Sequence, residues 1–441
     1  GFGGGVLFYD NQWDLSRGDE IWDWCFADID ATFLHILARP DYEPVNDNED
    51  WRTLDTRRMD FAASDRAIRV TRKALAKDPD LKIYLSLYSP PAWMKTNNAT
   101  GGEGSLKPGL AYRRELAEYL FAYLKRLQGA GVAVDYLAMF NEPDWTHSQD
   151  GMHFADLGEL ADVFDQTAAA LEELIAADGT LAMPTLVFPD SLGAGSLTRS
   201  RQNTPKLLAR SEMLARRVGV WGVHDYWNQG GYWPVRFREL RDFPPVGDKP
   251  IWMTEWAQRY RYGDLESANE YGANILNAVR LGAQAWMVFE WCHPSQNQSG
   301  LISCDWGAKP PRRRYWRSKA YYVFQQLANA TPAGAMVLPS VARSRDGLLD
   351  PAANQSQVLE HLAVAADGRL ILHLHNRGGD PLEVRATLRG VTAAEAIATG
   401  PLGNSQPHAG ADLRAGAGNK ATLTTRVPAN TLVTVTLPAA E

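Results

Sequence analysis

Two glutamates in this sequence each follow an apolar stretch and lie beside aromatic residues. The first occurs in VDYLAMFNEPDW (134–145), where an apolar run ends at Asn141 and Glu142. The second occurs in IWMTEW (251–256), where Glu255 precedes Trp256. Two carboxyl groups flanking a glycosidic bond can hydrolyse it, because one protonates the leaving oxygen while the other attacks the anomeric carbon or activates water. The pair therefore predicts glycoside-cleaving chemistry, provided that the fold brings the two groups together.

Side chains beside the glutamates are candidates for supporting roles. Asn141 can hydrogen-bond a sugar hydroxyl next to the anomeric carbon. We expect burial near Trp145 to raise the pKa of Glu142 and keep it protonated as the acid. Glu290, which follows another apolar stretch, is the main rival to Glu255 as the second carboxylate.

Arg39, His224 and Tyr226 also stand at the ends of apolar stretches. His224 and Tyr226 can hold and orient the attacking carboxylate, and Arg39 can keep Glu255 ionised by its opposite charge. Each has a plainer explanation, since a buried histidine is often only hydrogen-bonded in the core and an arginine often forms a structural ion pair.

The elements that must position these residues alternate between apolar runs and amphipathic stretches up to about residue 330. Near-continuous apolar character is typical of strands buried on both faces. Helical patterns lie between them at 57–75, 112–129, 154–178 and 267–281. An α/β fold, a (β/α)8 TIM barrel, is predicted, because no phosphate-binding glycine loop supports an open doubly wound sheet. The expected strands are 4–9, 33–38, 82–87, 134–139, 185–188, 218–224, 251–254 and 285–289.

The pattern changes after about residue 332 to alternating polar and apolar residues. Five such stretches predict strands, and Asp367-Gly368 between the first two is a hairpin signal. We therefore expect a catalytic barrel over 1–331 and a C-terminal antiparallel β-sandwich over 332–441. No low-complexity linker separates them, so the sandwich is expected to pack against the barrel. The five stretches are 358–365, 370–376, 383–388, 421–427 and 432–437.

The composition narrows the function classes. The 441 residues include 45 Lys and Arg against 52 Asp and Glu, a net charge of −7, which argues against nucleic acid as a partner. No apolar stretch approaches the roughly 20 residues of a membrane span. We expect a monomer whose partner is a carbohydrate, with no cofactor and no metal.

The sequence contains an unusually large number of tryptophans, fifteen. Tryptophan is typical of sugar-binding clefts, because an indole face stacks on the apolar face of a pyranose ring. Five follow expected strand ends, and two or three of these are expected to be sugar platforms while the rest pack in the core. They are Trp93, Trp145, Trp227, Trp256 and Trp291.

Several motifs together resemble glycoside hydrolase family 30. They are the opening GFGGG, YSPPAWMKTN (88–97), FNEP (140–143), HDY (224–226), TEW (254–256) and YYVFQQLANATPAGAMVLPS (321–340). The resemblance covers most of the chain and implies retaining hydrolysis of β-linked sugars, with Glu142 as acid/base and Glu255 as nucleophile. It also implies that Trp93 lines the site, and Arg39, Asn141, His224 and Tyr226 match positions of the pattern.

Departures from that pattern leave the substrate open. Tyr88 stands where such families often have Trp, and the acidic loop 41–51 and the loop after the eighth strand are unfamiliar. A related barrel hydrolase of algal galactans would share this core, and a catalytically dead carbohydrate-binding protein is the alternative from another class. We expect secretion or a periplasmic location.

Two other features stay ambiguous in the sequence. Cys292 and Cys304 can close a loop as a disulfide, but three free thiols including Cys25 are an equal alternative. The basic run Arg312, Arg313 and Arg314 is predicted to be solvated surface rather than a site for a uronate or sulfate.

Overall fold

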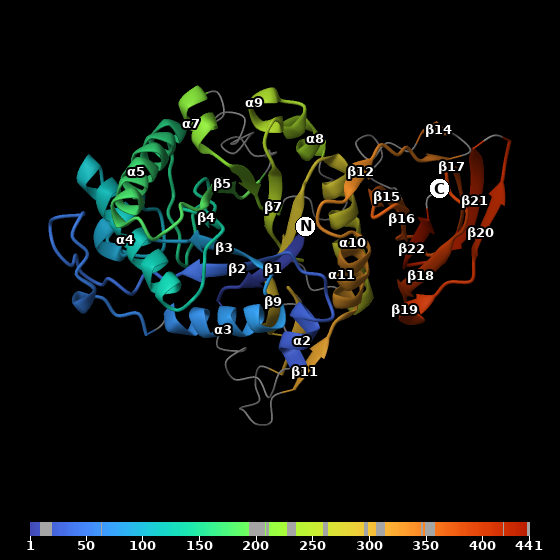
Figure 1. Cartoon of the computed structure of the whole chain (residues 1–441), viewed down its shortest axis with the longest axis horizontal. Helices are drawn as coiled ribbons and strands as arrows, with labels where there is room; N and C mark the ends of the chain where they lie inside the picture. Colours follow the sequence, from blue (N-terminus) through green and yellow to red (C-terminus); the bar gives the residue numbers. More distant parts are fainter. Residues whose placement is uncertain are drawn as a thin grey trace.

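Eight parallel strands form a closed barrel in the order of the sequence, β1 to β8 (Figure 1). The computed structural model describes residues 1–8, 20–62, 64–193, 208, 211–226, 235–258, 263–294, 299–305, 314–344, 347–348, 358–417 and 419–438. The barrel confirms the predicted fold class. Its strands are β1 Phe2–Val6, β2 Phe33–Ala38, β3 Lys82–Leu87, β4 Tyr136–Ala138, β5 Thr185–Ser191, β6 Val220–Val223, β7 Ile251–Trp256 and β8 Ala285–Val288.

Helices surround the barrel, and α10 and α11 lie between it and the C-terminal sheets (Figure 1). Within the described residues, none of them is both long and apolar enough to cross a lipid bilayer. The helices are α2 Glu20–Phe26, α3 Ser64–Lys77, α4 Leu110–Gly129, α5 Leu157–Asp178, α7 Glu212–Arg217, α8 Val235–Arg241, α9 Pro244–Gly247, α10 Asp264–Leu281 and α11 Lys319–Ala330, with short 3-10 turns at Thr56–Arg58 and Ala92–Met94.

The apolar strands face two hydrophobic layers, as expected for strands covered on both sides. Side chains from seven of the eight strands pack together in one inner cluster that includes Tyr84, Val187 and Trp252, and the outer faces pack against the helices. Glycine is required in β1, because a Cβ on Gly4 would lie 2.4 Å from Cγ1 of Val288. The opening glycines thus permit the close approach of β1 to β8.

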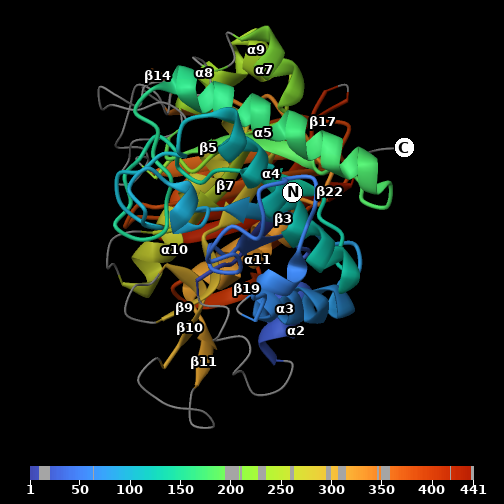
Figure 2. The same cartoon turned by 90° about the vertical axis from the view of Figure 1, so that its left-hand side faces the viewer.

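The predicted element bounds differ from the structure mainly at their ends. The helix predicted over 57–75 begins only at Ser64, because 56–58 form a separate 3-10 turn. The eighth strand ends at Val288, and Glu290 opens a further strand instead of closing the barrel. That strand, β9 (Glu290–Pro294), joins β10 (Gly300–Cys304) and β11 (Tyr315–Arg317) in a small sheet that projects below the barrel (Figure 1, Figure 2).

The C-terminal part consists of antiparallel sheets packed over a shared core, which confirms the predicted sandwich. The hairpin at Asp367 and Gly368 is also confirmed, since both residues have positive φ (50° and 69°). One sheet has the order β12-β15-β16-β22-β18-β19, another β17-β21-β20, and β13 and β14 form a separate pair. Their bounds are β12 Met336–Leu338, β13 Arg343–Ser344, β14 Gly347–Leu348, β15 Leu359–Ala366, β16 Arg369–Asn376, β17 Leu382–Arg389, β18 Glu395–Gly400, β19 Gly403–Pro407, β20 Ala411–Ala415, β21 Lys420–Val427 and β22 Thr431–Pro438.

The sandwich packs on the barrel through α10 and α11. The buried amide of Gln326 on α11 donates to Oγ1 of Thr434 at 2.9 Å and accepts from Oγ1 of Thr399 at 2.6 Å. Lys319 donates to the backbone oxygen of Gly400 at 2.9 Å. A buried amide whose hydrogen bonds are satisfied stabilises this junction. The exact domain boundary at 331/332 stays a prediction.

Candidate active site

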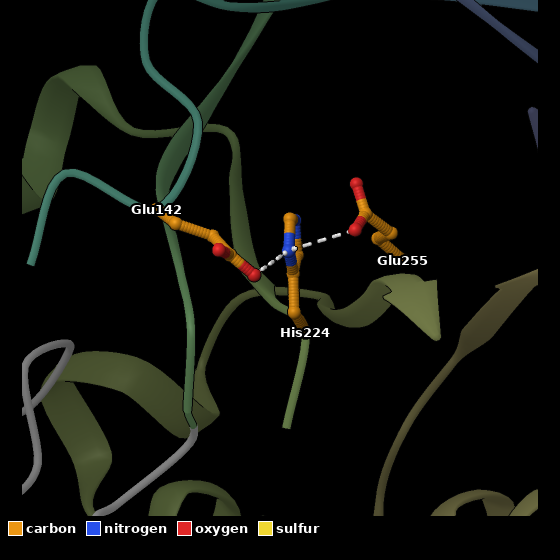
Figure 3. Close-up of side chains that lie close together, drawn as sticks. All are labelled: Glu142, His224 and Glu255. Atoms are coloured by element: carbon orange, nitrogen blue, oxygen red, sulfur yellow. Dashed lines mark hydrogen bonds and ion pairs between the residues drawn. The ribbon is translucent and has the colours of Figure 1, made fainter. Parts of the chain in front are cut away.

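The two predicted glutamates meet at the carboxyl ends of the barrel strands. Glu142 follows β4, Glu255 lies in β7, and His224 follows β6. Figure 3 shows the imidazole of His224 between the two carboxyl groups. Nδ1 of His224 lies 2.8 Å from Oε1 of Glu142 and 3.6 Å from Oε1 of Glu255. A carboxylate oxygen from each glutamate and this nitrogen all lie within 4.8 Å of one another.

Glu255 is held by two hydroxyl groups. Tyr226 donates to Oε1 at 2.8 Å and Tyr88 donates to Oε2 at 2.5 Å. A carboxyl group that accepts a hydrogen bond on each oxygen is well solvated as an anion, which suits a nucleophile. The predicted contact of Tyr226 with Glu255 is therefore present. Tyr88 was noted in the sequence only as a departure, and the structure gives it this second contact.

Burial and charge set the pKa values of the two glutamates in opposite directions. Burial is the largest influence on Glu142 and raises its pKa, but the contacts and charges of His147 and His224 together outweigh burial and lower the pKa to about 2. The expectation that burial near Trp145 keeps Glu142 protonated is therefore wrong for this arrangement. Burial raises the pKa of Glu255, and the charge of Glu142 adds to it while His224 and two tyrosines oppose it.

His224 carries the positive charge at the centre of the site. Burial alone lowers its pKa, but Glu255, Asp190 and Glu142 outweigh burial and raise the pKa well above its usual range. Nε2 of His224 lies 3.5 Å from Oδ1 of Asp190. Tyr84 and Thr254 also donate to Asp190, at 2.8 and 2.5 Å, and thereby fix the carboxylate behind His224.

Three residues at the ends of neighbouring strands have left-handed backbone conformations. They are Glu142 (φ 43°), Asp190 (φ 59°) and Asp225 (φ 46°). This conformation is unfavourable for residues with a Cβ and is concentrated at functional sites. The backbone N–H of Glu142 donates to the carbonyl of Asp190 at 2.8 Å, which ties the two turns together.

A pocket of about 270 Å³ opens directly over the two glutamates. Asn141, Trp145 and Tyr226 line it as predicted, together with Phe8 and Phe289. Oδ1 of Asn141 is buried and has no hydrogen-bond partner among the described residues, so it is available to a sugar hydroxyl. Trp145 is half-buried, as a sugar platform requires.

Two tryptophans predicted near the substrate are instead core residues. Trp256 and Trp291 are both fully buried among the helices outside the barrel. Strict alternation would place Trp256 on the same inner face as Trp252. The pairing of β7 with β8 changes register between Met253 and Trp256, so Trp256 packs against Tyr271 of α10, with ring centroids 5.1 Å apart. In β9, alternation of side chains separates Trp291 from its neighbour Glu290. Both predictions of sugar contact are therefore wrong.

Other predicted residues lie around the pocket rather than in it. The indole N–H of Trp93 donates to the carbonyl of Glu43 at 3.0 Å, and Trp93 is not among the described pocket residues. Arg39 donates to the carbonyl of Leu7 at 3.2 Å and is not among the main influences on the pKa of Glu255. Trp227 lies outside the described residues.

The rival carboxylate Glu290 has a structural contact. It accepts hydrogen bonds from the backbone N–H groups of Leu7 and Phe8, at 3.3 and 2.8 Å. It is fully buried and is not among the pocket residues. These contacts favour Glu255 over Glu290 as the partner of Glu142.

The remaining ambiguous features are settled in part. Cys25, Cys292 and Cys304 are all free and buried, so the disulfide alternative is not present. Of the basic run, Arg312 and Arg313 lie outside the described residues.

The acidic loop 41–51 directs two of its five carboxyl groups inward, while Asp41, Glu49 and Asp50 are exposed. Glu43 and Asp47 are buried, together with Glu115 and Glu118 of α4. Burial and the neighbouring carboxylates raise the pKa of Glu43 to about 8 and that of Glu118 to about 9. The loop therefore does not present Glu43 or Asp47 to a substrate.

One residue of the site was missed altogether. His147, five residues after Glu142, places Nε2 3.0 Å from Oε2 of Glu142. It lies in the loop after β4, where neither strand alternation nor helical spacing marks an inward-facing residue. As for metal ions, the described residues offer one group with suitable spacing, Glu142, His224 and Glu255, and these side chains already bond one another, Tyr88 and Tyr226.

Comparison with known proteins agrees with this geometry. The model of the glycosyl hydrolase family 30 TIM-barrel domain matches residues 41–165, which include Glu142. The chain resembles glycoside hydrolase family 30. A family 30 subfamily 8 xylanase from Clostridium acetobutylicum superposes with a TM-score of 0.73 at 20% identity, covering 100% of this chain and 96% of the xylanase.

Two further matches point the same way. The catalytic domain of a family 30 xylanase from Talaromyces cellulolyticus has a TM-score of 0.75 at 18% identity, covering 100% of this chain and 96% of that domain. An endo-1,6-β-D-glucanase from Neurospora crassa is 39% identical over 67 residues. That segment spans 15% of this chain and only 14% of the glucanase. The structural likeness shows the fold, and the sequence matches support the family resemblance.

Proposed function

We propose that the protein is a retaining glycoside hydrolase that cleaves β-glycosidic bonds in a polysaccharide or oligosaccharide by double displacement. The observation that carries the proposal is the approach of one oxygen of Glu142 to one of Glu255, within 4.8 Å, at the floor of a pocket. Retaining enzymes hold their carboxyl groups about 5–5.5 Å apart, whereas inverting enzymes leave about 6.5–9.5 Å for a water molecule. The short separation therefore favours retention.

In the first step, Glu255 attacks the anomeric carbon while Glu142 protonates the departing oxygen. Tyr88 and Tyr226 hold Glu255 as an anion aimed at the pocket. In the second step, Glu142 removes a proton from water, whose oxygen displaces Glu255 from the sugar. Asn141 lies beside Glu142 with a free amide oxygen, in reach of a hydroxyl next to the reacting carbon.

The assignment of roles depends on which carboxyl group holds a proton when the substrate is bound. The raised pKa of Glu255 would suit an acid, whereas its two hydroxyl donors suit an anion. The family resemblance assigns the nucleophile to Glu255, and we adopt this order. Azide rescue separates the two possibilities, because azide attacks from the face that the missing carboxylate occupied.

The test starts with product analysis on xylan, β-1,6-glucan, β-1,6-galactan and agar, and with NMR of the first-formed anomer. We expect retention of the β configuration. Glu142→Gln and Glu255→Gln should each lose on the order of a thousandfold in rate. Azide should give a β-glycosyl azide with Glu142→Ala and an α-glycosyl azide with Glu255→Gly. Inverted products, or full activity of Glu255→Gln, would disprove the proposal.

The named relatives act on xylan or on 1,6-β-glucan, so these two polymers come first in the panel. Both are polymers of cell walls or matrices, and action on them would place the protein outside the cytoplasm. The monomeric state stays a prediction, and gel filtration with light scattering tests it.

A further inference from the structure

His147 lies beside the one oxygen of Glu142 that His224 does not contact. Its Nε2 is 3.0 Å from Oε2 of Glu142, while Nδ1 of His224 is 2.8 Å from Oε1. The side chain of His147 is 22% exposed and lines the pocket, so it is reachable from the substrate side. Glu142 is thus held between two imidazoles, one buried below it and one at the pocket wall.

The loop that carries His147 is fixed by the loop after β3. The carbonyl of His147 accepts a hydrogen bond from the N–H of Gly102 at 2.6 Å, and the N–H of Gly151 donates to the carbonyl of Thr100 at 2.9 Å. Lys95 is buried between the two loops and donates to the carbonyls of Thr100, at 2.8 Å, and Gly151. Burying an amine is costly unless it is bonded, so this lysine rigidly joins the loops.

The imidazole also needs the glycine beneath it. A Cβ on Gly151 would lie 2.9 Å from Cδ2 of His147, closer than side chains normally approach. The ring of His147 therefore packs directly on the backbone of Gly151. Its place beside Glu142 is set by two loops and not by a free surface rotamer.

The charges around Glu142 explain what His147 does there. Burial raises the pKa of Glu142, and His147 and His224 outweigh burial and bring the pKa to about 2. Glu255 faces the same space from β7. The other ionisable groups around the site include Asp190 of β5, Tyr88, Tyr226, the buried Lys95 and Asp150, which lines the pocket. A general acid in this environment needs a proton source.

We propose that His147 is a positioning residue that orients Glu142 and exchanges a proton with it during the reaction. The inference rests on the proposed function. In the first step, the Nε2 proton of the imidazolium passes to Oε2, and the carboxyl group gives a proton to the glycosidic oxygen as its bond to the anomeric carbon breaks. In the second step, Glu142 takes a proton from water and returns one to His147. No oxidant, reductant or other reactant is required.

The experiment compares His147→Gln and His147→Ala with wild type and with His153→Gln, a half-buried histidine of the same loop whose backbone N–H donates to Gly104. The probes are phenyl and 2,4-dinitrophenyl β-glycosides of the sugar that wild type hydrolyses best. Dinitrophenolate leaves without protonation, so kcat/KM for it does not need the acid. We expect kcat/KM to fall about 10- to 100-fold for the phenyl glycoside and to change less than about threefold for the dinitrophenyl glycoside in both His147 variants.

A readout independent of substrate is the titration of Glu142 by ¹³C NMR, with Glu142→Gln identifying its signal. Losing the cation that lowers its pKa should make Glu142 take up a proton at a pH at least about one unit higher in His147→Gln than in wild type. A residue that only shapes the loop would leave this titration unchanged when glutamine replaces it.

The outcomes separate this inference from the proposed function. If wild type hydrolyses the probes and Glu142→Gln is inactive on the phenyl glycoside, but His147→Gln matches wild type in titration and leaving-group dependence, the role of His147 is refuted alone. An equal loss on both glycosides also refutes it, because that result indicates a binding or folding defect. If wild type hydrolyses nothing, the proposed function fails and the proton exchange fails with it.

Discussion

Replacing Tyr88 by phenylalanine tests how the site keeps its nucleophile charged. The hydroxyl of Tyr88 donates to Oε2 of the buried Glu255 at 2.5 Å, and Tyr226 donates to the other oxygen at 2.8 Å. The ring of Tyr88 packs edge-on against Phe8, with centroids 5.2 Å apart. Tyr88→Phe keeps that packing and removes one of the two hydroxyl donors.

The expected size follows from the contact. A hydrogen bond to a charged group contributes about 1.5–3 kcal/mol, and about 1.4 kcal/mol corresponds to one pH unit. The bond stabilises the ionised form, so its loss raises the pKa of Glu255. Because ionised Glu255 is the attacking form, the acid limb of the kcat/KM profile should move about 1–2 pH units higher.

The assay is kcat/KM against pH on the dinitrophenyl β-glycoside, whose cleavage isolates the nucleophile from the acid. Tyr123→Phe is the matched control, since the buried hydroxyl of Tyr123 donates to the carbonyl of Leu37, at 3.3 Å, and does not line the pocket. Its acid limb should match wild type. A folded Tyr88→Phe enzyme with an unchanged acid limb, or one moved to lower pH, would refute the reasoning.

Four further substitutions have defined outcomes. Trp145→Ala should raise KM about three- to tenfold with little loss of stability. Trp256→Ala should instead lower the free energy of unfolding, measured with denaturant, by about 3–5 kcal/mol. The reverse pattern would indicate that Trp256, and not Trp145, is the sugar platform. Glu118 binds its proton more tightly in the folded protein, where its pKa is raised to about 9. Its contribution to the free energy of unfolding is therefore full below about pH 4.5 and is lost as pH rises through 9. Glu118→Gln should therefore raise the free energy of unfolding at pH 9 by about 1–3 kcal/mol and leave it nearly unchanged at pH 5. Equal effects at the two pH values would contradict this prediction. Gln326→Ala removes the hydrogen bonds that join α11 to Thr434 and Thr399, so urea unfolding should show a loss of about 1–3 kcal/mol. A neutral result would show that the amide does not stabilise the junction.

The barrel and its two glutamates could be predicted because both depend on local patterns with a fixed geometric consequence. Strands buried on both faces are apolar throughout, and the carboxyl ends of parallel strands meet at one rim. A glutamate at the end of β4 and another at the end of β7 must then approach each other. The sandwich was recognised for the same reason, from the alternation of its longer strands.

Strand alternation alone could have located one contact of the site, that of Tyr88, but could not have corrected the prediction for Trp256. Trp256 stands four residues after the inward-facing Trp252, so strict alternation would place it inside the barrel. The register change between Met253 and Trp256 turns it to the helices, where it is fully buried. Tyr84, Ser86 and Tyr88 share one face of β3 and its end, so the inward direction of Tyr84 already indicates that of Tyr88. The sequence therefore held the signal for Tyr88 but not that for Trp256.

Other features were decided only by the tertiary structure. His147 reaches Glu142 because Lys95 and Gly151 join two loops that are about 50 residues apart in sequence, and no local pattern encodes such a contact. The pKa of Glu142 likewise depends on His147 and His224, which the fold brings beside it and which reverse the effect of burial. Periodicity determines which face of a strand a residue occupies, but the charge state of a buried group depends on every neighbour that the fold places within a few ångströms.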